Sequence, residues 1–418
     1  MKGVNGFYQL GKFSGAVVDN IMSFLEFKSL NALLQTCKKA QMHFHVRGLR
    51  YESSINERYP SYWNMSRIGD GGGGVVFKVR DPKAPIDSRD SFVALKVVKK
   101  NIQYGFAVWK RLRTEIDLQL KIDHPHIAKL IDVFQTPDEV VLVIEAGDGG
   151  SLRKVFEVLR SNHQQISWFT AHCLYQSASA LIHLREQKIA HRDIKCDNIV
   201  LSDDFSRVMM IDFGLAELLT SDRQPFTPCG TVGFASPENI AAVAERRAKF
   251  HADINVMHKA DMFSLGVVAY MMLSSTKPFK GSRFPEMHRE VQQGLRCQGR
   301  GWGHVSTGAI QLVERLLRGD AASRASAEEV MQDPWVLEGC KRFKDVIARR
   351  QEDLKKQRDL LESEFDMPTF ERTSHRSPTT GDGGSSKGAD GLPDDGESGG
   401  VWTIEGEECV SAQTRFVS

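Results

Sequence analysis

The stretch AHRDIKCDNIVL, residues 190–201, places three polar side chains of different chemistry between apolar flanks. Asp193 can accept a hydroxyl proton, Lys195 can balance the charge of a phosphoryl group in transfer, and Asn198 offers an amide oxygen to a hard divalent cation. A surface loop needs no such combination. The stretch therefore predicts a site that takes a proton, holds an anion and holds a cation.

A second stretch, MMIDFGLAE at residues 209–217, places Asp212 directly after an apolar, strand-like run. Magnesium usually takes few protein ligands and completes its shell with water and substrate phosphates. The pattern predicts Asn198 and Asp212 as ligands of Mg²⁺.

The glycine-rich stretch IGDGGGGVVFKV, residues 68–79, contains Gly69, Gly71 and Gly74 between two strand-like pieces. Glycines let backbone N–H groups approach phosphate oxygens closely. The stretch continues as a strand, which disfavours a dinucleotide-binding motif, where a helix follows. It predicts a loop that covers phosphates, although glycine-rich turns are often only turns.

Lys96 lies in the strand-like run VALK, residues 93–96. A strand lysine is usually a solvated edge charge. However, Glu115 follows on the predicted helix RLRTEIDLQLKI, residues 111–122, and a lysine held by a glutamate is oriented toward a phosphate.

The order and separations of these motifs match the signature set of the protein kinases. The chain resembles the eukaryotic protein kinases of Ser/Thr type over about residues 64–337, and DPWVL after Arg324 is similar to the calcium/calmodulin-dependent-like kinases. The resemblance implies an α+β, bilobal fold. A small antiparallel β-sheet lobe with one key helix would sit beside a larger, mostly helical lobe.

The resemblance also implies roles for individual residues, with ATP and Mg²⁺ as cofactors and protein hydroxyls as substrates. Asp193 would be the catalytic base. Lys195, Lys96 and Glu115 would be the other catalytic residues, with Lys96 contacting the phosphates of ATP and paired with Glu115. Glu145 and Gly147 would hydrogen-bond adenine through the backbone of the hinge. The implied nucleotide-binding positions are Ile68, Gly69, Gly71, Gly74, Val76, Ala94, Lys96, Glu145, Gly147, Asn198 and Asp212.

PCGTVGFASPE, residues 228–238, resembles the end of a kinase activation loop. By resemblance, Thr231 lies near the catalytic aspartate, Glu238 pairs with Arg324, and Asp261 anchors the catalytic loop. These expectations tie the loop to the larger lobe.

Control by phosphorylation is a further implication. Kinases with an arginine before the catalytic aspartate, here Arg192, often need a phosphate on the activation loop to neutralise it. Thr227 has the spacing of that phosphorylation site, and the alternative is that it is only a loop residue. Arg192 and Thr227 are therefore the predicted regulatory pair.

Three features depart from the family pattern. Gln119 stands where the family packs a leucine, one turn after Glu115, and a polar group there would loosen the active alignment. Ser151 stands where many arginine-directed kinases carry glutamate. The separation between Glu238 and Asp261 is longer than usual, and we expect AERRAKFHADINVMHKA, residues 244–260, to form a solvated, helical surface insertion.

The flanks suggest three further segments around a kinase domain at 61–338. Residues 1–60 are expected to be helical. Within them, residues 20–45 resemble an F-box that binds a ubiquitin-ligase adaptor, or form a helical hairpin on the small lobe. Residues 339–366 predict a charged helix, solvated rather than autoinhibitory, and residues 367–418 predict a disordered tail that is too poor in apolar side chains to fold.

Composition excludes several classes of protein. The chain carries 55 Lys and Arg against 53 Asp and Glu, so the strongly basic field of a nucleic-acid-binding protein is absent. Its seven cysteines form no CxxC pair, which argues against a zinc site and favours a reducing compartment, the cytoplasm or nucleus. No apolar run predicts a signal peptide or membrane span.

Two other functions are alternatives to an active protein kinase. The first is a catalytically weak kinase fold that serves as a scaffold, with the F-box-like segment as its adaptor-binding part. The second is a small-molecule kinase, which GTVGFASPE, residues 230–238, disfavours because this segment resembles a platform for peptide substrates. An active protein kinase is favoured because the five residues that phosphoryl transfer needs are all present. They are Lys96, Glu115, Asp193, Asn198 and Asp212.

Overall fold

The computed structural model describes ten segments of the chain. They are residues 49–60, 66–71, 74–84, 92–100, 105–221, 223–245, 250–281, 283–292, 295 and 297–365. The F-box-like segment at 20–45 and the predicted tail at 367–418 lie outside these residues, so both remain predictions.

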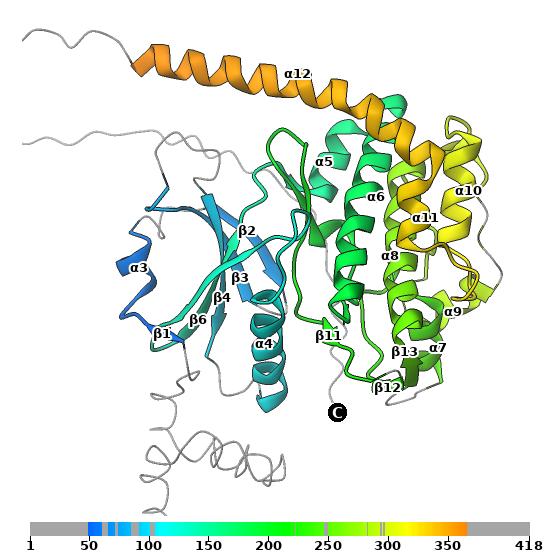
Figure 1. The fold of residues 1–418 in the computed structure, drawn as a ribbon, viewed down its shortest axis with the longest axis horizontal. Coiled ribbons are helices and arrows are strands. Elements are labelled where there is room, and N and C mark those ends of the chain that lie inside the picture. The colour runs from blue at the N-terminus through cyan, green and yellow to red at the C-terminus, as the bar shows by residue number, and fades with distance from the viewer. Residues whose placement is uncertain are drawn as a thin grey trace, which may run out of the picture. The chain divides into compact units, whose positions relative to one another are not determined.

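The small lobe is built on a six-stranded sheet in the order β1-β5-β6-β4-β3-β2 (Figure 1). All neighbours are antiparallel except β1, which is parallel to β5. The strands are β1 (Arg50–Tyr51), β2 (Ser66–Gly71), β3 (Gly74–Arg80), β4 (Phe92–Lys99), β5 (Leu130–Gln135) and β6 (Glu139–Glu145).

Both faces of this sheet are covered, which explains the nearly continuous apolar runs of β4 and β6. Successive side chains of a strand point to opposite faces. Leu95 and Val97 of β4 accordingly join one buried cluster, while Ala94 and Val98 join another that includes Ile116 of helix α4 (Gly105–Gln119). Lys96 shares the face of Ala94 and Val98, so the strand itself directs its side chain toward α4.

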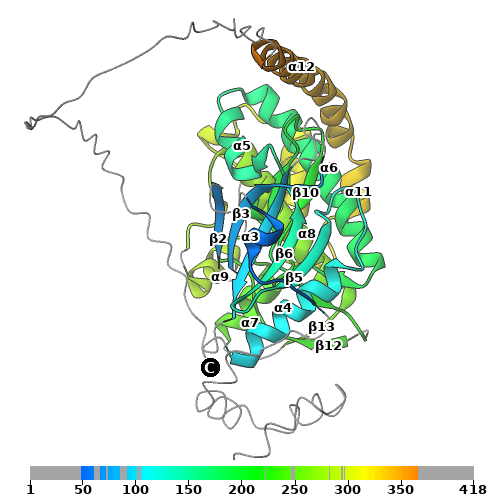
Figure 2. The ribbon, with the colours of Figure 1, turned by 90° about the vertical axis from the view of Figure 1, so that its left-hand side faces the viewer.

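The first described residues belong with this lobe. Strand β1 pairs with β5, and Ile55 of helix α3 (Ile55–Arg58) and Tyr59 are buried against the sheet with Phe134. Figure 2 shows α3 in front of the strands. Residues 49–60, the end of the segment 1–60 that we expect to be separate from the kinase domain, therefore pack on the sheet face that α4 leaves uncovered.

The larger lobe is mainly helical, which confirms the predicted bilobal α+β class. Its central helix, α8, is buried along nearly its whole length. The helices are α5 (Leu152–Leu159), α6 (His163–Glu186), α7 (Pro237–Ala244), α8 (Ile254–Ser274), α9 (Phe284–Gln292), α10 (Thr307–Leu316), α11 (Ala327–Gln332) and α12 (Pro334–Phe365), with 3₁₀ turns η5 (Cys196–Asn198) and η6 (Arg300–Trp302).

Short antiparallel ladders carry the loops of this lobe. They are β7 (Gly150–Ser151) and β10 (Val208–Met210) on either side of β9 (Ile199–Leu201), β8 (Ile189–Ala190) with β11 (Glu217–Leu218), and β12 (Arg223–Phe226) with β13 (Phe250–Asp253). Strand β13 and the start of α8 lie in the segment expected to be a solvated helical insertion. That expectation was wrong, because Ala252 is buried.

The charged C-terminal helix begins at Pro334, so the expected boundary between 338 and 339 falls inside one continuous helix. Phe343 is fully buried, with its ring centroid 5.3 Å from that of Phe169. Farther along, Arg350 lies over Phe205, 3.8 Å from the ring centroid. The helix therefore packs on the larger lobe to at least residue 350, which corrects the expectation of a solvated helix.

Among the described residues, no helix combines the length and apolar character that crossing a bilayer requires.

A buried ion pair joins α7 to the segment before α11. Arg324, whose side chain is fully buried, lies 2.8 Å from Oε1 of Glu238, as the sequence predicted. Its other N–H groups donate to the carbonyl oxygens of Lys259 at 2.6 Å and Arg318 at 3.0 Å. The guanidinium thus holds three separate segments of backbone and side chain.

We expect Arg324→Met to lower the free energy of unfolding by about 3–5 kcal/mol, because it leaves the Glu238 carboxylate and three backbone carbonyls without their donor. The matched control is Arg342→Met, whose guanidinium forms an exposed pair with Glu338 and should contribute less than about 0.5 kcal/mol. Urea unfolding followed by tryptophan fluorescence measures both. Equal losses for the two variants would contradict the structural role of Arg324.

Candidate active site

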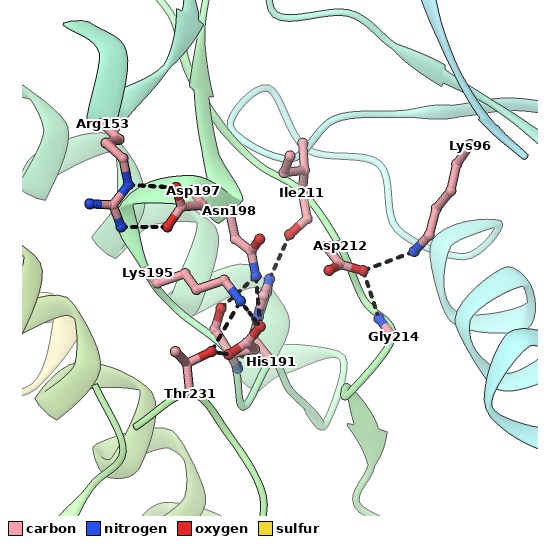
Figure 3. Close-up of polar contacts among 11 residues, drawn as sticks. Lys96, Arg153, His191, Lys195, Asp197, Asn198, Ile211, Asp212, Gly214 and Thr231 are labelled. Carbon is pink, nitrogen blue, oxygen red and sulfur yellow. Dashed lines mark hydrogen bonds and ion pairs between the residues drawn. The ribbon is translucent and has the colours of Figure 1, made fainter. Parts of the chain in front are cut away.

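Lys96 is held between two carboxylates from different lobes. Its Nζ lies 2.6 Å from Oε1 of Glu115 on α4. It also lies 2.9 Å from Oδ1 of Asp212, a contact that Figure 3 shows. Burial disfavours the charge on Lys96, but the two carboxylates outweigh it and hold the pKa of Lys96 above its usual value. For Asp212, Lys96 likewise outweighs burial and lowers the pKa. The ammonium and the Asp212 carboxylate are therefore both charged at neutral pH.

Asp193 is oriented by three donors. Its Oδ2 accepts from Nζ of Lys195 at 2.7 Å and from Nδ2 of Asn198 at 2.9 Å. Its Oδ1 accepts from Oγ1 of Thr231 at 2.7 Å, which places Thr231 beside the aspartate as the sequence predicted. The structure thus brings three polar residues of the opening stretch together around one carboxylate.

The loop that contains Asp193 is held in place by a side chain of α8. The buried carboxylate of Asp261 accepts the backbone N–H groups of His191 and Arg192, each at 2.8 Å. This confirms the predicted anchoring role of Asp261. Arg192 has a φ of +70°, a left-handed conformation that costs a non-glycine residue about 1–3 kcal/mol, and these two bonds help to stabilise it.

The catalytic loop also contacts the segment of Asp212. The imidazole of His191 lies 3.1 Å from the carbonyl oxygen of Ile211, and its ring centroid lies 4.9 Å from that of Phe213. The backbone N–H of Ile211 donates to the carbonyl of Asn198 at 3.0 Å. These contacts set Asn198 and Asp212 on adjacent segments.

The side-chain oxygens of Asn198 and Asp212 are suitable ligands for a magnesium ion. Asn198 uses its Nδ2 to bond Asp193, which leaves its amide oxygen for a cation. Asp212 offers a charged carboxylate, and its φ of +66° is a second strained backbone position. Within the described residues no group of three or more His, Cys, Asp or Glu side chains could hold a metal. A cation here would complete its shell with phosphate and water oxygens.

Two of the predicted glycines stand where no other residue fits. Gly74 has a φ of +133°, and a Cβ there would lie 2.4 Å from the carbonyl oxygen of Val97. A Cβ on Gly147 would lie 2.5 Å from Cβ of Val200. The first glycine lets β3 turn tightly over β4, and the second lets the segment after β6 approach β9.

The remaining predicted nucleotide positions divide into apolar and backbone ones. Val76 and Ala94 of the small lobe share one apolar cluster with Val200 and Ile211 of the larger lobe, a pairing that suits the two faces of a flat base. Ile68 is 44% exposed on β2. Gly69 pairs with Val76, and Gly71 pairs with Gly74 at the end of the β2–β3 hairpin.

Glu145 is tied to the larger lobe through its side chain. Its carboxylate forms an ion pair with Arg207, and its backbone N–H donates to the carbonyl of Lys129 at 2.9 Å. The hinge is thus linked to the β9–β10 connection. This contact was not predicted, because Arg207 lies outside the motifs recognised in the sequence, 62 positions from Glu145.

A second unpredicted pair lies beside the catalytic loop. The guanidinium of Arg153 on α5 donates two bonds of 2.6 Å to the carboxylate of Asp197 (Figure 3). These bonds lower the pKa of Asp197. The negative charge between Lys195 and Asn198 is therefore balanced within the chain.

Arg192 also has its charge balanced internally. Its guanidinium forms an ion pair with Glu217 of β11 and donates to the backbone carbonyl of Thr227. The structure thus brings Arg192 and Thr227 into contact, and it adds Glu217, which the sequence motifs did not identify.

Gln119 lies on α4 one turn after Glu115 and is 3% exposed. Neither its amide oxygen nor its nitrogen has a hydrogen-bond partner among the described residues. A buried polar group without a partner costs about 1–3 kcal/mol. The observed position of α4 therefore leaves the Gln119 amide buried without a hydrogen bond to any described residue.

Comparison with known proteins agrees with this geometry. The model of the "Protein kinase domain" family matches residues 62–336. An Aurora kinase of Candida glabrata is 30% identical over 271 residues, which are 65% of this chain and 69% of that protein. A carbon catabolite-derepressing protein kinase of the same yeast is 31% identical over 243 residues, 58% of this chain and 37% of that protein.

Calcium-dependent protein kinase 3 of Plasmodium yoelii yoelii is 28% identical over 309 residues, 72% of this chain and 53% of that protein. The matches thus span between 37% and 69% of these relatives' lengths. Since the family model covers more than half of the sequence and its range contains the whole Lys96–Asp193–Asp212 arrangement, the chain belongs to the protein kinase family.

Proposed function

We propose that this chain is a Ser/Thr protein kinase that transfers the γ-phosphate of ATP to hydroxyl groups of proteins. The observation that carries the proposal is the contact of the buried Lys96 ammonium with the buried Glu115 carboxylate and the partly exposed Asp212 carboxylate. It supports an arrangement in which both lobes are already set for phosphoryl transfer. The three relatives described above are all named as kinases, which supports the same class of reaction.

In this proposal Lys96 binds the phosphates of ATP, and Glu115 keeps the ammonium pointing at them. Asn198 and Asp212 hold Mg²⁺, which neutralises charge on the phosphate oxygens when it is bound. Val76 and Ala94 contact the base from the small lobe. Because the transition state is loose, positioning and electrostatic stabilisation supply most of the rate.

Asp193 accepts the proton of the substrate hydroxyl. Its three donors hold the carboxylate in one orientation, so no reorganisation is needed when the hydroxyl arrives. Lys195, one of these donors, also stabilises negative charge on the phosphoryl group in transfer.

An active kinase is favoured over a catalytically weak scaffold, because none of the five groups needed for transfer is missing or turned away. The F-box-like segment at 20–45 is outside the family match and outside the described residues. Binding of a ubiquitin-ligase adaptor, and a location in the cytoplasm or nucleus, stay predictions from the sequence.

Thr227 and Arg192 are proposed as the regulatory pair. A phosphate on Thr227 would add negative charge beside the Arg192 guanidinium, which already contacts the Thr227 carbonyl. We expect a higher kcat for chain carrying phosphothreonine at 227 than for Thr227→Ala. A lower kcat would exclude an activating role for this phosphate.

The test of the proposed reaction is Asp193→Asn. The amide keeps the shape of the side chain but cannot accept the proton, so kcat should fall by at least about 10²–10⁴-fold while ATP binding is unchanged. Transfer of radiolabelled phosphate from ATP to a general substrate such as casein measures it. The control is Asp353→Asn on the exposed part of α12, which should retain full activity, and equal transfer by both variants would contradict the assignment.

A second prediction concerns the buried amide of α4. Gln119→Leu should raise the free energy of unfolding by about 1–3 kcal/mol and should raise kcat/KM, because α4 then holds Glu115 against Lys96 without an unsatisfied amide. Gln164→Leu, at an exposed helix position, should change stability by less than about 0.5 kcal/mol. Loss of stability in Gln119→Leu would mean that the amide has a partner in solution.

A further inference from the structure

The segment just before Thr227 is paired with a strand from a distant part of the chain. Strand β12 (Arg223–Phe226) runs antiparallel to β13 (Phe250–Asp253), with Gln224 opposite Ala252 (Figure 1). Strand β13 lies in the extra length between Glu238 and Asp261. We call the part of the chain from Asp212 to Glu238 the activation segment. It is therefore held by an insertion of the same chain.

This pairing is supported by a small apolar core. Phe226 is fully buried, and it clusters with Leu219 of the activation segment, Ala252 of β13 and Met257 of α8. Ala190, two residues before Arg192, completes the cluster. Burial of a phenylalanine side chain is among the larger apolar contributions that a single residue makes. The end of β12 is thus fixed next to the catalytic loop.

The charge of Arg192 is compensated in the same place. Its side chain is 7% exposed, and its guanidinium pairs with the Glu217 carboxylate. The guanidinium carbon also lies 5.7 Å from the centroid of the Phe226 ring. A buried arginine beside the catalytic aspartate needs a counter-charge, and here Glu217 supplies one before any phosphate is added.

We propose that Phe226, Glu217 and β13 act together as an internal clamp, which positions the activation segment while Thr227 is unphosphorylated. This inference rests on the proposed kinase activity and specifies its regulation. A phosphate can only shift the population of the ordered segment. If that population already exceeds about one half, the gain in activity is limited to about twofold. Phosphorylation of Thr227 therefore adds a small increment to an activity that is already present.

The experiment compares the full chain with and without phosphothreonine at 227, the latter treated with phosphatase and checked by mass spectrometry. The kcat and KM for ATP and a protein substrate are measured for both forms. We expect the two forms of the unsubstituted chain to differ by less than about threefold. An unphosphorylated form that is more than about threefold slower than the phosphorylated form would overturn the proposal.

Variants of the clamp should make activity depend on the phosphate. Phe226→Ala should lower the kcat of the unphosphorylated form about a hundredfold and leave the KM for ATP unchanged, and phosphothreonine at 227 should recover most of the loss. Phe226→Leu keeps an apolar side chain in the cluster and should behave nearly as the unsubstituted chain does. If Phe226→Ala and the unsubstituted chain gain equally from the phosphate, the clamp is refuted.

Glu217→Gln provides an independent route if Phe226→Ala does not fold. It removes the counter-charge of Arg192 while keeping nearly the same shape, so the gain from phosphothreonine should rise to at least about tenfold. A gain that stays below about threefold would contradict the role given to Glu217.

Hydrogen exchange separates this proposal from the proposed reaction. The backbone amides of Arg223, Gln224 and Phe226, the three residues of β12 that have an N–H, should exchange slowly in the unphosphorylated chain and faster in Phe226→Ala. If no form of the chain transfers phosphate, the kinase proposal fails, and slow exchange at 223–226 would still support the clamp. Fast exchange there in the unphosphorylated chain would refute the clamp even in an active enzyme.

Discussion

The ammonium of Lys96 lies between two carboxylates that come from different parts of the fold. Strand β4 supplies the lysine, helix α4 supplies Glu115, and the segment after β10 supplies Asp212. Removing charges from water is costly, and breaking a buried pair by losing one partner costs about 3–5 kcal/mol. The network is therefore satisfied only when the sheet, the helix and the larger lobe take one relative arrangement, which is the arrangement that phosphoryl transfer requires.

The larger lobe holds its side of this arrangement by means of strained but well-supported backbone. Asp212 and Arg192 both have left-handed φ angles, at +66° and +70°. Such conformations persist only where surrounding contacts determine them. For Arg192 those contacts are the Asp261 carboxylate from α8 and the Glu217 carboxylate from β11. For Asp212 they are Lys96 and the neighbouring bond between His191 and the Ile211 carbonyl. Catalytic geometry is thus imposed by the fold rather than by local sequence preference.

Sequence was informative where chemistry and chain order coincide. Asp193, Lys195 and Asn198 are close in sequence, and the motif that contains Lys96 stands in the order and at the separations that resemble the protein kinases, so both groups could be predicted together with the bilobal class. Contacts between residues outside the recognised motifs could not be predicted in this way. Arg153 meets Asp197 across 44 positions, and Phe226 meets Ala252 because an insertion returns as a strand. Residues 250–253, FHAD, are too few to predict a strand before the pairing partner is known.

The two lobes differ in how firmly they support the shared network. On the activation-segment side, a buried phenylalanine, a strand pair and a compensated arginine all stabilise the same conformation. On the α4 side, the favourable Lys96–Glu115 contact is opposed by the buried amide of Gln119 on the same helix, which has no hydrogen-bond partner among the described residues. Because both sides meet at Lys96, a displacement of α4 would break the Glu115 contact while leaving Asp212 in place. Among the described contacts, the position of α4 is therefore less well supported than that of the activation segment.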